Sequence, residues 1–365
     1  MTVTIGVEEE FHLLDPVRRV PAEDAERVLA AAESLGLTIE PELQLSQIEV
    51  ATGICTTLPE LRAQIAEHRR AAVAATADVG LAVAGSGSLP AALDLAGQPY
   101  PKRRYQRLIA EYAEVGREQL VCAMQTQVGV EDREQAVAAL PYVGAWLPVL
   151  LALSASSPYF DGEDTGYASY RSVLWSRWPS AGPPLAFASA AEYDETVAAL
   201  VASGTVADPG MVYFDVRPSA RYPTLEVRIC DAVPLLDDAV TLAGLARALV
   251  VTALRTVDGS GPEFVPPRPE LVRAARWRAG RSGLSTVLID PRTAAAVPAR
   301  AAVEALLEHL HPALDELGDR DAMAEGVAAI LRRGTSADRQ RAAYSRRESL
   351  PDAVDDLLAE TLIGL

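Results

Sequence analysis

Three glutamates stand side by side near the start of the sequence, in the segment TIGVEEEFHLLD. Successive side chains of a strand point to opposite faces, so Glu8 and Glu10 share one face and Glu9 points to the other. Two carboxylates on one strand face lie roughly 7 Å apart, close enough to ligate one cation together or two neighbouring cations separately. The segment therefore predicts a divalent cation site on the face of Glu8 and Glu10.

Four further segments repeat this alternation of polar and apolar side chains: QIEVATG, CAMQTQVGV, TLEVRICD and YFDVR. Their polar faces carry Glu49, Gln125, Gln127, Arg217, Glu226 and Arg228. Mg²⁺ takes carboxylate and amide oxygens as ligands, and arginine matches the oxygens of a phosphate. The set suits a concave face that holds divalent cations and phosphate. For any single strand, a sheet with one solvated face is the alternative explanation.

These segments belong to a strand-rich first two thirds, which precedes a helix-rich third at about residues 236–365. Strands are expected at 3–14, 43–52, 80–86, 119–130, 211–217 and 224–231. Helices are expected at 22–35, 59–78, 132–153, 190–203, 236–257, 269–282, 299–317, 320–333 and 350–363. Strands and helices do not alternate regularly, and YFDVRPSARYPTLEVRICD is typical of a hairpin with a six-residue loop. The pattern favours an α+β fold with a largely antiparallel sheet.

Composition excludes several classes of protein. The 365 residues include 33 basic and 50 acidic ones, and a formal charge of −17 argues against nucleic acid or an anionic membrane as a partner. Cys55, Cys122 and Cys230 are odd in number and far apart, which predicts reduced thiols without disulfides. The amino terminus lacks the pattern of a signal peptide, and the longest apolar run, WLPVLLALSA, is too short to span a bilayer. We therefore expect a cytoplasmic protein.

Two other motifs predict little chemistry. AGSGSLP at 84–90 fits neither the phosphate-binding loop nor the dinucleotide fingerprint, and it is more typical of a turn. EHLHP places His309 and His311 two residues apart, where they diverge on a helix and lack the four-residue step of a zinc site. We expect both histidines at the surface.

Taken together, six segments resemble the successive motifs of the YbdK-type carboxylate-amine ligases, also called type 2 glutamate-cysteine ligases. They are TIGVEEEFHLLD, ELQLSQIEVATG, LALSASSPYFDGEDTGYASYRS, YFDVRPSARYPTLEVRICDA, ARWRAGRSGL and RGTSADRQRAAY, in this order over nearly the whole chain. The resemblance implies a glutamine synthetase-like catalytic fold, with a curved, mainly antiparallel sheet and helices packed on its convex face. It also implies one catalytic domain over residues 1–365.

The resemblance further implies an ATP-dependent ligase that uses Mg²⁺ or Mn²⁺. In this family ATP phosphorylates a substrate carboxylate, and an amine then attacks the acyl phosphate to form an amide. The implied partners are a small-molecule carboxylate and amine, and other copies of the chain in a homo-oligomer. The implied metal ligands are Glu8, Glu10, Glu49 and Glu226. The residues implied to bind the nucleotide are Arg217, Arg228, Gln125 and Gln127, with Arg228 and Glu226 as the catalytic pair.

Two departures from the family pattern bear on function. Where many members have H-V-H-V-G, this chain has QTQVG, so Gln125 and Gln127 replace two histidines and remove any acid-base role there. Where the family often has G-T-H-P, this chain has AGSGSLP, so cysteine is not assumed as the amine. A catalytically silent nucleotide- or metabolite-binding homologue and a phosphotransferase of the guanido-kinase type remain alternatives.

Several residues have open roles. Glu9 is expected to pair with an arginine from a covering helix. His12 shares the face of Glu8 and either contacts substrate or metal or is a partly exposed residue at a strand end. The arginines of the later motifs either reach ATP or substrate or pair helices at the surface: Arg281, Arg339 and Arg341.

Overall fold

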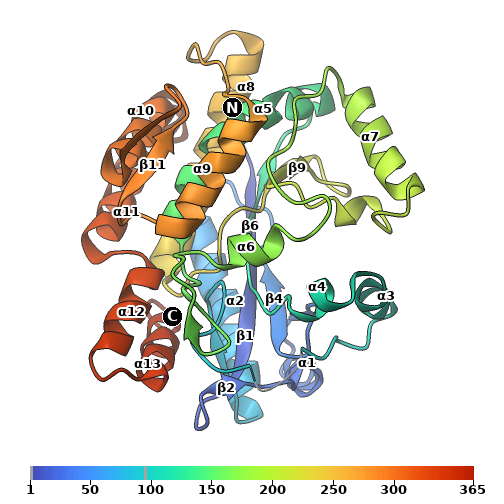
Figure 1. The fold of residues 1–365 in the computed structure, drawn as a ribbon, viewed down its shortest axis with the longest axis vertical. Coiled ribbons are helices and arrows are strands. Elements are labelled where there is room, and N and C mark those ends of the chain that lie inside the picture. The colour runs from blue at the N-terminus through green and yellow to red at the C-terminus, as the bar shows by residue number, and fades with distance from the viewer. Residues whose placement is uncertain (1–2, 94–96) are drawn as a thin grey trace.

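A computed structural model describes residues 3–93 and 97–365 (Figure 1). Its central sheet has the strand order β3-β4-β1-β6-β10-β9, and β2 and β5 pair with the far end of β1. Every pairing in this sheet is antiparallel. The strands are β1 (Ile5–Asp15), β2 (Val20–Pro21), β3 (Glu40–Pro41), β4 (Gln47–Ala51), β5 (Ala82–Ala84), β6 (Met124–Gly129), β9 (Val216–Pro218) and β10 (Thr224–Val227).

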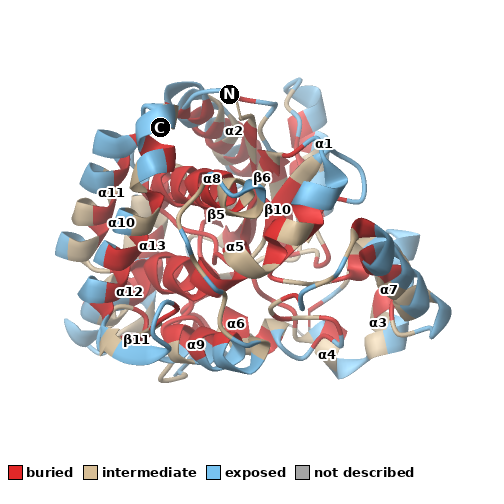
Figure 2. Ribbon diagram, turned by 90° about the horizontal axis from the view of Figure 1, so that it is seen from above, coloured by how far each residue is buried: buried red, intermediate tan, exposed pale blue. Residues whose placement is uncertain are grey.

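The apolar face of the sheet packs against long helices. Val7, Val128 and Leu225 belong to one buried cluster with residues of α5 (Arg133–Ser154) and α8 (Leu236–Asp258). A second buried cluster joins β1 and β4 to α1 (Ala25–Ser34) and α2 (Leu58–Asp78). Figure 2 shows most of α5 and α8 in the buried colour. Because these helices occupy one face, the opposite, polar face of the sheet is left for the site.

The remaining helices flank this core. In Figure 1, α10, α11, α12 and α13 lie along one side of the molecule, and α3, α4 and α7 lie on the other. Their bounds are α3 (Arg103–Tyr112), α4 (Glu114–Arg117), α6 (Arg171–Trp175), α7 (Ala190–Ala202), η1 (Pro209–Met211), α9 (Pro269–Ser282), α10 (Ala299–Leu317), α11 (Arg320–Arg333), α12 (Ser336–Ser345) and α13 (Leu350–Thr361). Two small hairpins complete the structure: β7 (Tyr159–Phe160) with β8 (Glu163–Asp164), and β11 (Val287–Asp290) with β12 (Ala295–Pro298).

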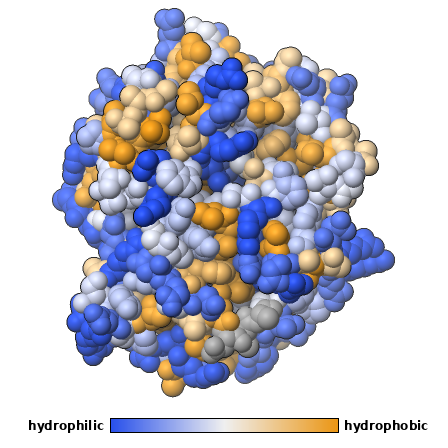
Figure 3. Space-filling view, viewed as in Figure 1, coloured by the Kyte–Doolittle hydropathy of each residue, from blue (hydrophilic) through white to orange (hydrophobic). Residues whose placement is uncertain are grey.

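Helices α5 and α8 are long and apolar enough to cross a membrane by length and composition. The run WLPVLLALSA, which alone is too short for a span, is largely contained in the 22-residue α5. The most apolar windows of the two helices are 83% and 78% buried inside the protein, and core helices pass the same test. On the face drawn in Figure 3, apolar side chains form separate patches among hydrophilic ones.

All nine expected helices are present within a few residues of their expected bounds. The β9–β10 hairpin is also present, but its loop has five residues (219–223) instead of six, and β9 begins at Val216 instead of residue 211. The sequence did not predict α3, α6, α12 or the β11–β12 hairpin, which are short elements whose stability comes from tertiary packing rather than from local pattern. The three cysteines are free and buried, as expected. His309 and His311 are half-buried rather than fully exposed, and the ring of His309 stacks on Trp146 at a centroid distance of 4.8 Å.

Candidate active site

A cavity of about 580 Å³ lies over the polar face of the central sheet. All eight predicted site residues line it: Glu8, Glu10, Glu49, Gln125, Gln127, Arg217, Glu226 and Arg228. They come together because β1 pairs with β4 along one edge and with β6 along the other, and β10 and β9 follow β6. Trp175, Trp178 and Tyr213 form an aromatic cluster on the cavity wall.

A second cavity, of about 620 Å³, lies between α3 and residues 204–211. It is slightly larger, but arginines and apolar side chains dominate its lining, and none of the eight predicted residues contributes to it. Arg104 borders both cavities. The chemistry of the side chains, rather than size, identifies the cavity over the sheet as the candidate site.

Three carboxylates form a cluster at the β4 end of this cavity. Glu10 lies directly opposite Glu49 in the β1–β4 register, and Glu42 reaches them from the segment that follows β3. One oxygen from each of the three lies within 4.8 Å of the others. Among the described residues this is the only group of His, Cys, Asp or Glu side chains with that spacing. Carboxylate oxygens grouped in this way suit a hard divalent cation.

The electrostatics of the cluster favour a cation. Burial raises the pKa of the Glu10 and Glu49 carboxyl groups, and burial together with the Glu10 charge raises the pKa of Glu42 to about 8. Three partly buried acids therefore resist ionising together, and a bound cation would relieve their repulsion. Glu42 was not predicted from the sequence, because it lies between β3 and β4 and outside any regular strand. Its place in the motif ELQLSQIEVATG, seven residues before Glu49, was the available signal.

The other end of the cavity holds Glu226 between two arginines. Arg217 donates to both oxygens of Glu226, at 3.0 and 3.3 Å, and Nη1 of Arg228 also donates to Oε1 of Glu226. Burial opposes ionisation of Glu226, but Arg228 and Arg217 outweigh it and lower its pKa to about 2. Glu226 is therefore ionised and paired, and it lies outside the cluster of three carboxylates.

The guanidinium of Arg228 is held from several directions. Its Cζ lies 5.8 Å from the ring centroid of Trp175 and 5.9 Å from that of Tyr213. Its side chain is 10% exposed, and its buried Nε has no hydrogen-bond partner in the described chain. An oriented, desolvated guanidinium with spare donors suits an anion such as phosphate.

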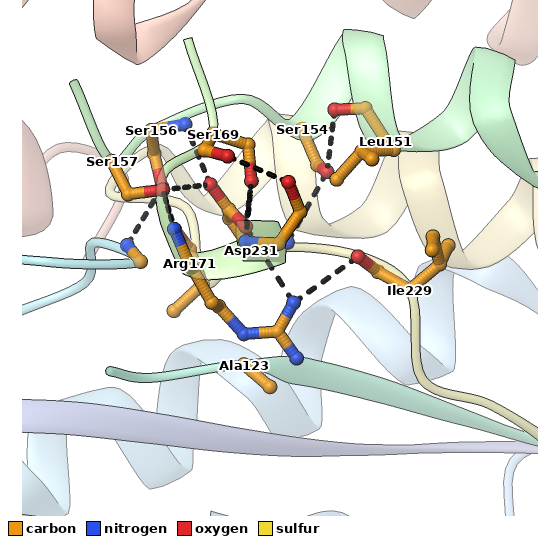
Figure 4. A network of polar contacts seen from close by, with 12 residues as sticks. Ala123, Leu151, Ser154, Ser156, Ser157, Ser169, Arg171, Ile229 and Asp231 are labelled. Atoms are coloured by element: carbon orange, nitrogen blue, oxygen red, sulfur yellow. Dashed lines mark hydrogen bonds and ion pairs between the residues drawn. The ribbon is translucent and has the colours of Figure 1, made fainter. Parts of the chain in front are cut away.

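A buried network around Asp231 supports the strand end that carries Arg228 (Figure 4). The Asp231 carboxylate accepts three hydrogen bonds, from Ser156 N at 3.1 Å, Ser157 Oγ at 2.7 Å and Ser169 Oγ at 2.8 Å. Arg171 lies 3.5 Å from the same carboxylate and donates to the carbonyl oxygens of Arg228 and Ile229 at 3.2 Å. The segments LALSASSPYF and YASYRS therefore fix the backbone at Arg228 and Ile229 without themselves contributing the predicted site residues.

The family model of glutamate-cysteine ligase family 2 (GCS2) matches residues 4–356. The chain belongs to this family. A Frankia alni protein described as "Putative glutamate--cysteine ligase 2-2" is 44% identical over 374 residues, which cover 98% of this chain and 97% of the relative. A Rhodococcus jostii protein described as "Putative glutamate--cysteine ligase 2-3" is 46% identical over 361 residues, 98% of this chain but 45% of the relative.

A Frankia casuarinae protein described as "Putative glutamate--cysteine ligase 2-2" is 45% identical over 360 residues, 98% of this chain and 41% of the relative. The chain thus spans less than half the length of this relative and of the Rhodococcus relative. The family resemblance expected from the six sequence motifs is confirmed.

Two solved structures share the fold. The glutamate-cysteine ligase of Francisella tularensis, solved in complex with AMP, aligns with a TM-score of 0.71 and 10% identity, and the alignment covers 100% of this chain and 89% of that one. A bifunctional glutathione synthetase from Pasteurella multocida aligns with a TM-score of 0.69 and 16% identity, covering 99% and 52%. At identities this low, the two structural alignments show the fold alone. They confirm the expected glutamine synthetase-like fold.

Glu9, the middle glutamate of the opening motif, has a structural role. Glu9 points away from the cavity and pairs with Arg69 of α2 at 2.6 and 3.1 Å, as expected. Both side chains are buried, and Arg69 also donates to the carbonyl oxygens of Val233 and Pro234. The pair anchors α2 to β1 and to the segment before α8.

His12 does not fit either expectation. It is 2% exposed rather than partly exposed, and it does not line the 580 Å³ cavity. Burial lowers its pKa to about 4, and its Nε2 has no hydrogen-bond partner in the described part of the chain. His12 is therefore a neutral core residue within β1, between β4 and β5.

The segment AGSGSLP is buried rather than a simple surface turn. Ser86 Oγ donates to the Ser156 carbonyl at 2.6 Å, and Ser88 Oγ donates to the Tyr159 carbonyl at 2.5 Å. A Cβ on Gly87 would lie 2.7 Å from Asp231, so only glycine fits there. This loop packs against the network around Asp231 and does not line the cavity.

The arginines of the later motifs pair elements outside the cavity. Arg339 pairs with Glu360 of α13 at 2.6 Å, and Arg341 pairs with Asp164 at 2.6 Å. Arg281 donates to the carbonyl of Gly166. Of the two roles expected for these arginines, the structure supports the pairing of helices and loops.

Proposed function

We propose that the chain catalyses ATP-dependent amide formation between a small-molecule carboxylate and an amine, through an acyl phosphate. One observation carries the proposal: a cluster of three carboxylates and a pair of oriented arginines face the same cavity, in a member of glutamate-cysteine ligase family 2. The first group suits cations and the second suits phosphate, which are the two needs of phosphoryl transfer. The AMP bound to the Francisella tularensis relative supports nucleotide use by this fold.

The residues present fit Mg²⁺ or Mn²⁺. Glu10, Glu42 and Glu49 would hold a cation, because their oxygens converge within 4.8 Å. Glu8 adds a carboxylate to the same face, and Glu226 would have to release one arginine before it could ligate a cation. A bound cation supplies charge neutralisation for a transferring phosphoryl group.

Arg228 and Arg217 have the anion-binding role in this proposal. A carboxylate is a poor electrophile, and phosphorylation gives it a leaving group that an amine can displace. The donors of Arg228 would stabilise charge on the phosphoryl oxygens, where preorganised donors act most strongly. Glu226 holds both guanidinium groups in place before substrate arrives. Gln125 and Gln127 occupy the floor of the cavity between the two ends.

We also propose that residues 1–365 form one catalytic unit, which works in the cytoplasm as a homo-oligomer. The reduced cysteines and the use of ATP support that location. The homo-oligomer rests on the family resemblance. Sedimentation of the purified chain tests it, and a monomer at micromolar concentration would contradict it.

The substrates are tested with a panel. Glutamate is the first acid to try, because the relatives are described as glutamate-cysteine ligases. We expect ADP release from ATP only when a suitable acid and amine are both present with Mg²⁺ or Mn²⁺, and one amide per ADP. The proposal fails if a broad panel of amino acids and amines yields neither ADP nor amide. A stable phosphorylated product without need for an amine would instead show a phosphotransferase.

A further inference from the structure

Gln125 and Gln127 occupy the places where many members of the family have histidine, and each amide is hydrogen-bonded within the protein at both its nitrogen and its oxygen. Gln125 Nε2 donates to Glu10 Oε1 at 3.0 Å, and its Oε1 accepts from Arg228 Nη1. Gln127 Nε2 donates to Glu8 Oε1 at 3.3 Å, and its Oε1 accepts from Thr224 Oγ1 at 2.6 Å. Each amide therefore uses both of its ends.

The partners dictate which end of each amide faces which group. A carboxylate only accepts hydrogen bonds and a guanidinium only donates them, so a side chain between Glu10 and Arg228 must offer a donor on one side and an acceptor on the other. A glutamine does this without adding charge. Gln125 is 5% exposed, so loss of either contact would leave a buried polar group unpaired.

The contacts are diagonal across the sheet. Gln125 lies directly opposite Glu8 in the β1–β6 register but donates to Glu10, and Gln127 lies opposite Gly6 but donates to Glu8. On its other side Gln127 lies opposite Glu226 and accepts from Thr224. The two amides thus form a hydrogen-bonded row that joins the carboxylates of β1 to the β10 strand.

We propose that Gln125 and Gln127 are positioning residues, which orient Glu10, Glu8 and Arg228 and do not themselves ligate a cation. The inference rests on the cation site of the proposed function and assigns these two residues a different role from direct contact with nucleotide or metal. The amide oxygens, which are the only atoms of a glutamine that suit Mg²⁺, each already accept a hydrogen bond, from Arg228 and from Thr224. Outer partners of ligating carboxylates commonly change metal affinity when they are replaced.

Thr224 gives the sharpest test, because it touches Gln127 and not the carboxylates. Titration of Mn²⁺ alone into the purified full chain measures cation affinity without any turnover. If Gln127 is a positioning residue, Thr224→Val frees its amide to rotate and weakens Mn²⁺ binding roughly three- to tenfold. If Gln127 is a ligand, the same change releases its oxygen, and Mn²⁺ binds as tightly as before or more tightly.

Two controls accompany this variant. Thr224→Ser keeps the hydroxyl and should restore the wild-type affinity. Thr126→Val makes the same substitution on the opposite face of the neighbouring strand and should not change Mn²⁺ binding. Wild-type affinity in Thr224→Val would overturn the role proposed for Gln127, as would equal losses in Thr224→Val and Thr224→Ser.

Gln125→Met tests the second amide. It should weaken Mn²⁺ binding about 10- to 100-fold. It should also raise the KM for ATP at saturating Mn²⁺, because Arg228 loses its contact with the amide. An unchanged KM for ATP beside weakened Mn²⁺ binding would show a simple ligand and overturn the role proposed for Gln125. The Mn²⁺ titrations remain informative even if no substrate pair gives an amide, so failure of the proposed ligase activity and failure of this inference are distinguishable.

Discussion

Glu10 on β1 lies directly opposite Glu49 on β4, with both carboxylates in the cavity and a third, from Glu42, within 4.8 Å. Side chains directly opposite on antiparallel strands lie about 5 Å apart, and like charges at that distance destabilise a sheet. The pair is therefore unfavourable for folding alone. A cation bound there, as proposed, would offset the repulsion between the two acids.

Glu42→Gln should weaken Mn²⁺ binding by about tenfold or more, because it removes one of three converging carboxylates. Isothermal titration with Mn²⁺ measures the change. Glu40→Gln is the matched control: Glu40 also lines the cavity and lies opposite Glu49, but it is exposed and outside the cluster. Equal losses in the two variants would show general charge attraction rather than a defined site.

Glu226→Gln should abolish turnover while the protein stays folded, because it changes charge but little volume. The substitution removes the charge that orients Arg217 and Arg228 and so loosens the proposed phosphate site. Steady-state kinetics with the best substrate pair, together with a circular dichroism spectrum, measures both effects. Wild-type kcat in this variant would remove Glu226 from the proposed catalytic pair.

Glu9→Gln should cost stability far more than activity. Glu9 and Arg69 form a buried pair, and removal of one charge leaves the other buried without compensation, which costs about 3 kcal/mol. Urea denaturation gives the free energy of unfolding. Glu26→Gln, an exposed change on α1, is the control and should cost little. A Glu9→Gln variant that is as stable as wild type but inactive would move Glu9 into the site.

The contribution of His309 to the stability of the protein should fall as pH drops from about 6.5 to 4. Burial lowers the pKa of His309 to about 4, whereas an unfolded histidine has a pKa of about 6.5. The unfolded chain therefore binds more protons in this window, and unfolding is favoured as pH falls through it. Above pH 6.5 both states are neutral and the effect vanishes.

His309→Phe should reduce this pH dependence and keep the stacking on Trp146. Urea denaturation at pH 7.5, 5.5 and 4.5 measures the free energy of unfolding for wild type, His309→Phe and the control His311→Phe. If the free energy of unfolding of His309→Phe depends on pH as strongly as that of wild type, His309 does not make the expected contribution.

The alternation of side chains along each strand was enough to predict most of the residues that line the cavity over the sheet. Alternation is a local property, so Glu8, Glu10 and Glu49 could be assigned to one face without knowledge of their partners. The prediction that Glu9 needs a covering arginine followed from the same rule, although the sequence did not identify Arg69. Packing at long range decided that partner.

The parts that were missed depend on contacts between distant segments. Glu42 lies just outside a strand and joins the cluster only because β3 and β4 turn it toward Glu10. The burial of His12 and of residues 84–90 follows from packing that no local pattern encodes. The double pairing of Glu226 with Arg217 and Arg228 is likewise visible only when β9 and β10 are placed side by side.

In the proposed reaction, ATP activates a carboxylate before the amine attacks. The most direct test of this activation uses an acid labelled with ¹⁸O in the carboxyl group, together with ATP, Mg²⁺ and the amine that supports turnover. Mass spectrometry of the released phosphate then follows the label. An acyl phosphate predicts one ¹⁸O atom transferred to phosphate for each amide formed. Amide formation with unlabelled phosphate, or ADP release without any amide, would contradict it.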